Sequence, residues 1–257
     1  MSERNGLEHR KREVKFSFWS SVVIGILLVS FFLAPLSLEK GTVNNLSGNA
    51  NMFDYVSDDE SSWGSAGNGN TGPHDHGEGE IVEHNQFAWS ELNFFAAFMY
   101  GFGDLNCHQK HERSWEVNEN QMPVCARDVG IFFGLFVGSL AFYFRGVNRW
   151  TVRDTCLSIL PDKWLESTYT KNNRTFAWLG LGTLLCIPLI FDGFYQLLTS
   201  YESTNPLRLI TGIPFGFGIA VLFIGMYCAR SQFFENAASV HLPGGVKFTL
   251  AKNEDSE

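Results

Sequence analysis

Hydrophobic residues along the chain are concentrated in four long runs that contain no charged residue. A helix needs about 20 apolar residues to cross the roughly 30 Å hydrocarbon core of a bilayer, and flanking side chains that reach the interface can complete a somewhat shorter run. The pattern therefore predicts transmembrane helices at residues 16–38, 129–144, 175–191 and 209–229.

A fifth apolar run covers residues 92–103 and is bounded by Glu91 and Asp104. Its 12 residues are too few for a span and fit a re-entrant segment or a short amphipathic helix. The predicted fold class is therefore all-α. We expect an integral membrane helical bundle of about four transmembrane helices plus this short element, with the lipid bilayer as its surroundings.

Basic residues are distributed unevenly between the segments that connect the predicted helices. Five lie before the first run and six lie in residues 145–174, whereas Lys40 is the only one between the first run and Lys110. Cytoplasmic loops carry an excess of Lys and Arg. We therefore expect a multi-pass protein of the cell membrane with both termini in the cytoplasm and the segment after Cys107 outside. The first run predicts an uncleaved signal anchor, because it is long for a signal peptide.

Composition divides the chain into four parts. Residues 1–40 form a basic N-terminus with the anchor helix, and residues 41–86 form a flexible acidic linker rich in Gly, Asn and Ser. Residues 87–230 form the membrane domain, and residues 231–257 form a polar tail. The net charge is -8 and the basic residues form no continuous stripe, so nucleic acid is not an expected partner.

Glycines recur at a spacing of four residues in two of the predicted helices. One helix contains Gly130, Gly134 and Gly138, and another contains Gly212 and Gly216. Small residues at this spacing allow helix backbones to approach one another closely in lipid. The spacing therefore predicts tight packing of these two helices.

The polar segment between the fifth run and the next helix contains "CHQKHERSW" and then "PVCARD". Zinc binds the sulfur of Cys, the ring nitrogen of His and the carboxylate oxygen of Asp. The sequence therefore predicts a zinc site whose candidate ligands are Cys107, Cys125 and Asp128, with His108 or His111 as the fourth.

Two other states of the cysteines remain open. A disulfide between Cys107 and Cys125 is the structural alternative, because the segment is expected outside the membrane. Free thiols are the third possibility. A redox dithiol of the Cys-x-x-Cys type is disfavoured, because Asp128 occupies the position of the second cysteine.

Successive membrane helices run antiparallel, so three predicted helix ends lie on the same side of the membrane as the Cys/His segment. Ionisable residues at membrane depth are costly, and a group of them indicates a functional site. We expect a common polar vestibule there. Its candidate anion-binding residues are Gln109, Arg113, Arg127, Gln196, Asn205 and Arg208, and its candidate general bases are Asp192 and Glu202.

The motifs "CHQKHERSW", "PVCARDVGIFFG", "DGFYQ" and "STNPLRLITG", in this order, resemble the prokaryotic membrane-protein family known as domain of unknown function 2085. The resemblance covers roughly residues 93–219. The resemblance groups the chain with these proteins but does not imply a particular activity. Many members of the family have Cys-Ala-Arg-Cys where this chain has Asp128 in the last position.

These observations predict a metal-assisted hydrolase or transferase that acts on a lipid-linked or phosphorylated substrate. A bound Zn²⁺ lowers the pKa of water to about 7, and arginines hold phosphate. The alternatives are a small transporter or ion-sensing protein, in which the acidic residues bind an ion, or a structural membrane protein stapled by a disulfide.

Overall fold

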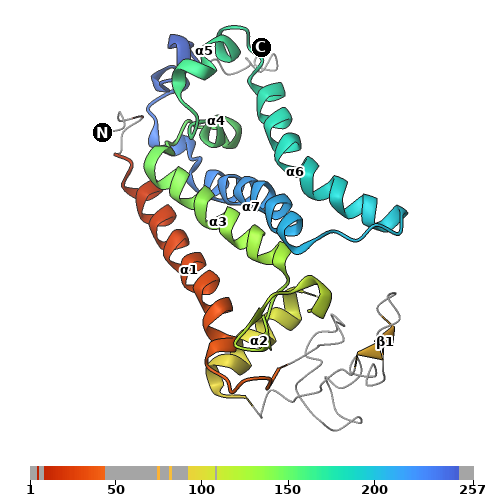
Figure 1. The fold of residues 1–257 in the computed structure, drawn as a ribbon. Coiled ribbons are helices and arrows are strands. Elements are labelled where there is room, and N and C mark those ends of the chain that lie inside the picture. The colour runs from red at the N-terminus through yellow and green to blue at the C-terminus, as the bar shows by residue number, and fades with distance from the viewer. Residues whose placement is uncertain are drawn as a thin grey trace, which may run out of the picture. The chain divides into compact units, whose positions relative to one another are not determined.

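The computed structural model describes residues 5, 9–43, 74–75, 81–82, 92–107 and 109–248. Most of the predicted acidic linker and His108 lie outside these residues. The described residues form a predominantly helical protein (Figure 1), whose α-helices are α1 (Lys11–Leu36), α2 (Phe94–Asn106), α3 (Ala126–Arg145), α4 (Val152–Leu157), α5 (Asp162–Thr170), α6 (Arg174–Leu198) and α7 (Asn205–Cys228).

Short strands and 3-10 helices complete the described structure. Strands β1 (His74–Asp75) and β2 (Ile81–Val82) pair antiparallel, as do β3 (Glu116–Val117) and β4 (Asn120–Gln121). The turn between β3 and β4 uses two residues with positive φ, which matches the twist of a tight hairpin. The 3-10 helices are η2 (His111–Arg113), η3 (Ser231–Phe233), η4 (Ala237–Ser239) and η5 (Pro243–Gly245).

Four of the helices are long and apolar enough to cross a membrane, namely α1, α3, α6 and α7. Each of them covers most or all of one predicted run, so the prediction of an all-α membrane protein with four spans is confirmed. Helix α2 has 13 residues and is about 20 Å long, which is shorter than the roughly 30 Å hydrocarbon core. It starts after Asn93, whose side chain accepts a hydrogen bond from the Ala96 N–H.

The chain folds into two compact units. The first contains residues 1–24, 133–190 and 214–257, and the second contains residues 25–132 and 191–213. Helices α1, α3, α6 and α7 each contribute residues to both units. The predicted site residues all belong to the second unit.

The second unit has an apolar core formed by the end of α1, by α2 and by the segment around the β3–β4 hairpin. Phe31, Tyr100 and Met122 are fully buried in it. Asn120 ties the hairpin to the end of α1, because its side chain donates to the carbonyls of Pro35 and Glu39 at 3.1 and 2.9 Å. These contacts hold the hairpin, which lies between Cys107 and Cys125 in the sequence, against the end of α1.

The first unit contains two helices within residues 145–174, a segment that the sequence analysis described only as a basic connection. Helix α4 follows Thr151, whose side chain accepts a hydrogen bond from the Asp154 N–H, and helix α5 follows Pro161. Buried apolar residues of the C-terminal tail, including Phe234 and Leu242, pack against this region. The described part of the tail is therefore folded onto the protein.

Helices α3 and α7 approach closely within the second unit. A Cβ atom added to Gly130 would lie 2.2 Å from the Leu209 carbonyl oxygen, and one added to Gly212 would lie 2.5 Å from the Arg127 carbonyl oxygen. Both contacts are with backbone atoms, so neither position has room for a side chain. The glycine spacing in the sequence correctly predicted this tight packing.

Candidate functional site

Cys107 lies at the end of α2, where its N–H donates to the Gly103 carbonyl at 2.7 Å. Its sulfur accepts backbone N–H groups from Gln109 at 3.4 Å and from Cys125 at 3.2 Å. Donors of this kind stabilise negative charge on sulfur and orient a metal ligand. Two backbone N–H groups therefore fix the position of the Cys107 sulfur.

Three predicted metal ligands lie together. One ligand atom from each of Cys107, Cys125 and Asp128 lies within 4.8 Å of the other two. Cys125 immediately precedes α3 and Asp128 lies in its first turn, and the Cys125 thiol donates to Asp128 Oδ2 at 3.1 Å. Both cysteines are free thiols in the structure. Two sulfur ligands and one carboxylate could hold a metal ion.

The surroundings of the Cys107 thiol oppose its ionisation. Its hydrogen bond with Cys125, and then its burial, raise the pKa of this thiol well above its ordinary value. Only 6% of the residue is exposed. A cation between the ligand atoms would reverse this preference, because a metal ion stabilises the thiolate directly.

Gln109 fixes the path of the chain between the two cysteines. It has a φ of 45°, and its side-chain amide donates to the carbonyls of Tyr100 at 3.0 Å and Pro123 at 2.8 Å. A Cβ atom at Gly103 would lie 1.7 Å from the Pro123 carbonyl oxygen, so only glycine allows this approach. Gln109, a predicted anion-binding residue, thus bonds to backbone carbonyls in this structure.

The predicted histidine ligands occupy different positions from the three clustered residues. His111 lies on η2, where its Nδ1 is 3.7 Å from a carboxylate oxygen of Glu116. It does not join the group of candidate ligands found among the described residues. His108 lies outside the described residues. The structure therefore brings together three of the five candidate ligands.

Arg127 and Asp192 form an ion pair between the start of α3 and the C-terminal part of α6. Arg127 Nη2 donates to Asp192 Oδ2, and Gln196 Nε2 donates to the same oxygen at 2.9 Å. The Asp192 side chain is 4% exposed, and its Oδ1 is buried and has no hydrogen-bond partner in the part of the chain that the structure describes. We call this pair and its neighbours the polar cluster: Arg113, Arg127, Asp192, Gln196, Glu202, Asn205 and Arg208.

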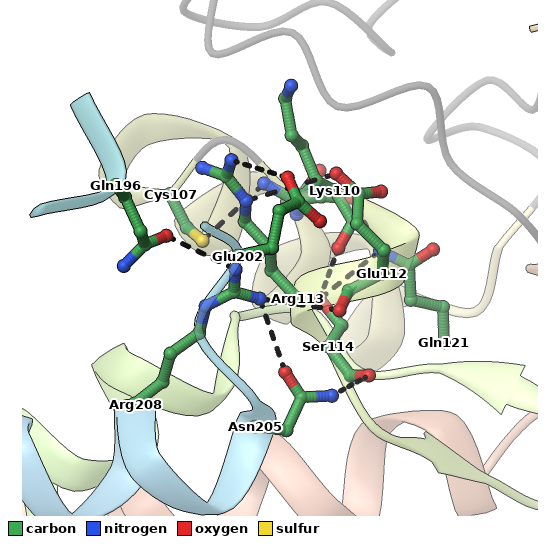
Figure 2. Close-up of polar contacts among 11 residues, drawn as sticks. Cys107, Lys110, Glu112, Arg113, Ser114, Gln121, Gln196, Glu202, Asn205 and Arg208 are labelled. Carbon is green, nitrogen blue, oxygen red and sulfur yellow. Dashed lines mark hydrogen bonds and ion pairs between the residues drawn. The ribbon is translucent and has the colours of Figure 1, made fainter. Parts of the chain in front are cut away.

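Arg208, in the first turn of α7, is the most unusual member of the polar cluster, because it is a fully buried guanidinium that is 2% exposed. Figure 2 shows it directed toward Gln196, Asn205 and the segment around Glu112. Its contacts are long, at 3.3 Å to the Glu112 carbonyl and 3.4 Å to the side chains of Asn205 and Gln196. All three acceptors are uncharged.

Within the described residues, no carboxylate oxygen lies within the 4.0 Å ion-pair distance of Arg208. Its Nε is buried and has no hydrogen-bond partner there. Arg113, Arg127 and Glu202 are close enough for their charges to act on it. The charge of Arg208 therefore interacts with those of its neighbours in the polar cluster. Among the described residues, however, no acidic side chain forms an ion pair with it.

Arg113 and Glu202 form the more exposed edge of the polar cluster (Figure 2). Arg113 Nη2 lies 3.7 Å from Glu202, and its Nε lies 3.9 Å from Glu112. The Glu202 side chain is 65% exposed. Asn205, a predicted anion-binding residue, donates to the Ser114 carbonyl at 3.0 Å. This bond ties the start of α7 to the Cys/His segment.

Sequence reasoning missed the residues that hold the cluster through their backbones. The carbonyls of Glu112 and Ser114 receive the bonds from Arg208 and Asn205, and the Gln121 side chain donates to the Gln109 carbonyl at 2.5 Å. Backbone acceptors carry no residue-specific signal. The nearest available sign was the Asn118-Glu119 turn, which predicts a hairpin between the two cysteines.

Comparison with known proteins finds relatives that are similar to this region of the chain. A family model described as "Predicted membrane protein (DUF2085)" matches residues 107–222, which include every candidate site residue. An uncharacterized protein of Methanothermobacter thermautotrophicus is 34% identical over 116 residues, covering 45% of this chain and 82% of the relative. An uncharacterized protein of Methanocaldococcus jannaschii is 28% identical over 134 residues, covering 52% of this chain and 71% of the relative. No solved structure matches this chain.

Proposed function

The chain belongs to the DUF2085 family of predicted membrane proteins, and we propose that its polar cluster, together with Cys107, Cys125 and Asp128, forms a zinc-dependent site for a lipid-linked phosphate. The reaction is a hydrolysis, or a transfer to another acceptor, at the phosphate group. The distribution of basic residues supports an extracytoplasmic location for this site.

The observation that carries this proposal is the buried, unpaired guanidinium of Arg208. Burying a charge is costly unless an opposite charge or strong hydrogen bonds accompany it. Arg208 has only long contacts to neutral acceptors and a buried Nε without a partner among the described residues. A phosphate oxygen is the acceptor that a guanidinium binds best, because it accepts two N–H groups at once. We assign Arg208 as the phosphate anchor.

The neighbouring ligand group supports metal assistance. Cys107, Cys125 and Asp128 supply three ligand atoms, which is the number that protein side chains contribute in catalytic zinc sites. When bound there, zinc would act as a Lewis acid on a phosphate oxygen or on water. Asp128 in place of a third cysteine leaves a site with two thiolates and one carboxylate, which zinc accepts.

Glu202 is better placed than Asp192 to act as the general base. Asp192 is held by Arg127 and Gln196 on one oxygen, whereas Glu202 is 65% exposed and lies 3.7 Å from Arg113. In a hydrolysis, the oxygen of water forms a bond to phosphorus and the bond from phosphorus to the leaving oxygen breaks. Glu202 takes a proton from the attacking water, and the leaving oxygen receives a proton from solvent.

The first test measures bound metal by mass spectrometry on the full chain purified in detergent under reducing conditions. We expect about one zinc per chain, which Cys125→Ala would remove because the site loses one of its two thiolates. Cys186→Ala is the matched control, since Cys186 is a free cysteine of α6 outside the cluster. Zinc that is absent from the wild type, with Cys107 and Cys125 joined in a non-reduced digest, would contradict the metal site and favour the disulfide staple.

The second test measures release of inorganic phosphate from phosphatidic acid and from a polyprenyl phosphate by the zinc-loaded protein. Glu202→Gln is expected to reduce the rate by about 10²-fold or more without removing zinc, as expected for loss of a general base. Glu166→Gln is the control, because Glu166 lies on α5 in the other unit. Release that is equal in wild type and Glu202→Gln would exclude this residue as the base, and no release from either lipid would contradict the hydrolase proposal.

A further inference from the structure

The first unit contains an apolar groove of about 490 Å³ between α4, α6 and α7. On α6 its lining runs from Trp178 to Ile190, and on α7 it runs from Phe215 to Leu222. Cys156 and its neighbours in and after α4 line one end of the groove. The volume lies within the range of roughly 300–1,000 Å³ that is typical of small-molecule sites.

The groove follows helices α6 and α7. The residues from Trp178 to Ile190 extend along about 18 Å of helix α6. This length slightly exceeds the depth of one leaflet, which is about 15 Å, or half of a hydrocarbon core of roughly 30 Å. Its outer wall is open, since Leu179 of α6 is 52% exposed.

Two arginines lie one helical turn from the Cys156–Trp178 end of the groove. Arg153 precedes Cys156 by three residues, and Arg174 precedes Trp178 by four. Both direct a nitrogen toward Oδ2 of Asp154, at 3.0 and 3.8 Å respectively. One carboxylate thus serves two guanidinium groups.

The same carboxylate has further donors. The hydroxyl groups of Thr151 and Tyr169 donate to Asp154 at 2.6 and 2.8 Å, and the residue is completely buried. Arg153 Nε and Arg174 Nη1 are buried and have no hydrogen-bond partner among the described residues. Two guanidinium groups share one carboxylate, so their positive charge exceeds what Asp154 can neutralise.

We propose that this groove binds the acyl chain of an anionic phospholipid whose headgroup phosphate lies against Arg153 and Arg174. Charge selects the headgroup: residues 145–174 contain six basic and three acidic residues, although the whole chain carries a net charge of -8. The guanidinium groups of the two arginines, whose side chains are 23% and 14% exposed, donate to the phosphate oxygens. The apolar walls of α6 and α7 bury the chain.

The test uses the full-length protein in lipid nanodiscs that contain phosphatidylglycerol with a photoreactive diazirine at the end of one acyl chain. A second set contains phosphatidylcholine with the same label. After illumination and digestion, mass spectrometry locates the labelled peptides. We expect the phosphatidylglycerol label on the peptides that contain Cys186 and Phe217, in excess over phosphatidylcholine by about tenfold, which corresponds to about 1.4 kcal/mol.

Two glycines of α6 provide a matched pair of variants. Both Gly180 and Gly182 have open space where a side chain would be added, but only Gly182 lines the groove. Gly182→Leu is expected to remove most of the groove label, and Gly180→Leu is expected to retain it. A bulky maleimide attached to Cys186 of the folded wild type is also expected to fill the groove, and it avoids any effect of a substitution on folding. Cys186→Ala treated with the same maleimide is the control.

The headgroup contact has its own comparison. Arg153→Gln combined with Arg174→Gln is expected to abolish the preference for phosphatidylglycerol, whereas Lys171→Gln, which removes an exposed charge nearby, is expected to keep it. Label that is spread along all exposed faces of α6 and is unaffected by Gly182→Leu would overturn the proposal. Cross-linking of two chains through Cys186 would also overturn it, because a second copy would then cover the groove.

Discussion

Arg127, in the first turn of α3, and Asp192, near the end of α6, are joined by a direct ion pair in which Gln196 supports the carboxylate. The two residues are separated by 65 positions in the sequence. Asp192 is almost fully buried, so its charge depends on Arg127 for compensation. This pair connects the segment of the cysteines to a second membrane helix.

We expect Asp192→Leu to lower the free energy of unfolding by about 3 kcal/mol, because it leaves the Arg127 guanidinium without its partner in a partly buried site. The double variant Arg127→Met with Asp192→Leu is expected to be less destabilised than the single variant. Thermal unfolding in detergent, followed by tryptophan fluorescence, measures both. Equal and additive losses in a double-mutant cycle would show that the two residues do not stabilise one another.

The close approach of α3 and α7 predicts that replacing different glycines by alanine has very different effects on stability. Gly130→Ala is expected to destabilise the protein by about 1–3 kcal/mol, because the added methyl group would meet the Leu209 carbonyl. Gly193→Ala serves as the control, since a Cβ atom there has no neighbour within 4 Å. It is expected to be neutral or to stabilise α6 by up to about 1 kcal/mol through helix propensity. Similar unfolding temperatures for the two variants would contradict the tight contact.

Arg208 provides a test of anion binding that does not depend on catalysis. Replacing an unpaired buried charge by an apolar residue of similar length costs little and can stabilise a protein. Arg208→Met is therefore expected to unfold at the same temperature as the wild type, or higher, in phosphate-free buffer.

Inorganic phosphate should then distinguish the two proteins. At about ten times its Kd, phosphate stabilises the wild type by about 1.4 kcal/mol, and it is expected to leave Arg208→Met unchanged. Sodium chloride at equal ionic strength controls for screening. A shift of equal size in both proteins would place the phosphate elsewhere.

Much of the fold could be predicted from the hydrophobic pattern. Charge-free runs identify spans because the bilayer sets their length, and the spacing of Gly130 and Gly212 relative to other small residues indicated where helices meet. Helices α4 and α5 were harder to predict. They are short and lie in a charged segment, so their stability comes from burial of residues such as Leu157 and Tyr169 against the C-terminal tail.

The candidate site could likewise be predicted only in part from the sequence. Antiparallel spans were enough to bring Asp192 and Arg208 to the helix ends near Cys107, because connectivity alone fixes the side of the membrane. The roles of individual residues depended on details that sequence does not carry. Gln109 bonds to backbone carbonyls, and His111 lies beside Glu116, because the local path of the hairpin segment decides where these side chains point.

Cys156 in α4 gives a prediction about pH. Burial raises the pKa of its thiol to about 12, whereas a thiol in the unfolded chain has a pKa of about 8.5. The folded state therefore keeps this proton at a pH where the unfolded state has lost it. Above pH about 8.5, the free energy of unfolding is expected to fall by up to about 1.4 kcal/mol per pH unit from this group.

Cys156→Ala should remove that part of the decline. Chemical denaturation at several pH values between neutral and alkaline conditions measures the slope for both proteins. Cys186→Ala, which changes another cysteine lining the same groove, provides the comparison. An unchanged slope in Cys156→Ala would show that the Cys156 thiol ionises equally in the folded and unfolded states.

Asp128 is the residue whose replacement most directly tests the proposed metal site. A thiolate is a softer ligand than a carboxylate, and zinc in closed protein sites is held mainly by sulfur and nitrogen. Asp128→Cys places a third sulfur in the first turn of α3, beside Cys107 and Cys125, within a group whose ligand atoms already lie within 4.8 Å of one another. Zinc affinity is therefore expected to rise by about tenfold or more.

Asp128→Ala removes the third ligand and should weaken zinc binding by a comparable factor. Asp104→Ala is the control, because it changes a buried acid of α2 that lies outside the ligand group. It should leave the zinc affinity of the folded protein unchanged. Competition with a chromophoric chelator under reducing conditions measures the three dissociation constants. Equal affinities in the wild type, Asp128→Cys and Asp128→Ala would mean that position 128 does not contact the metal, and the cysteines would then bind it without this carboxylate.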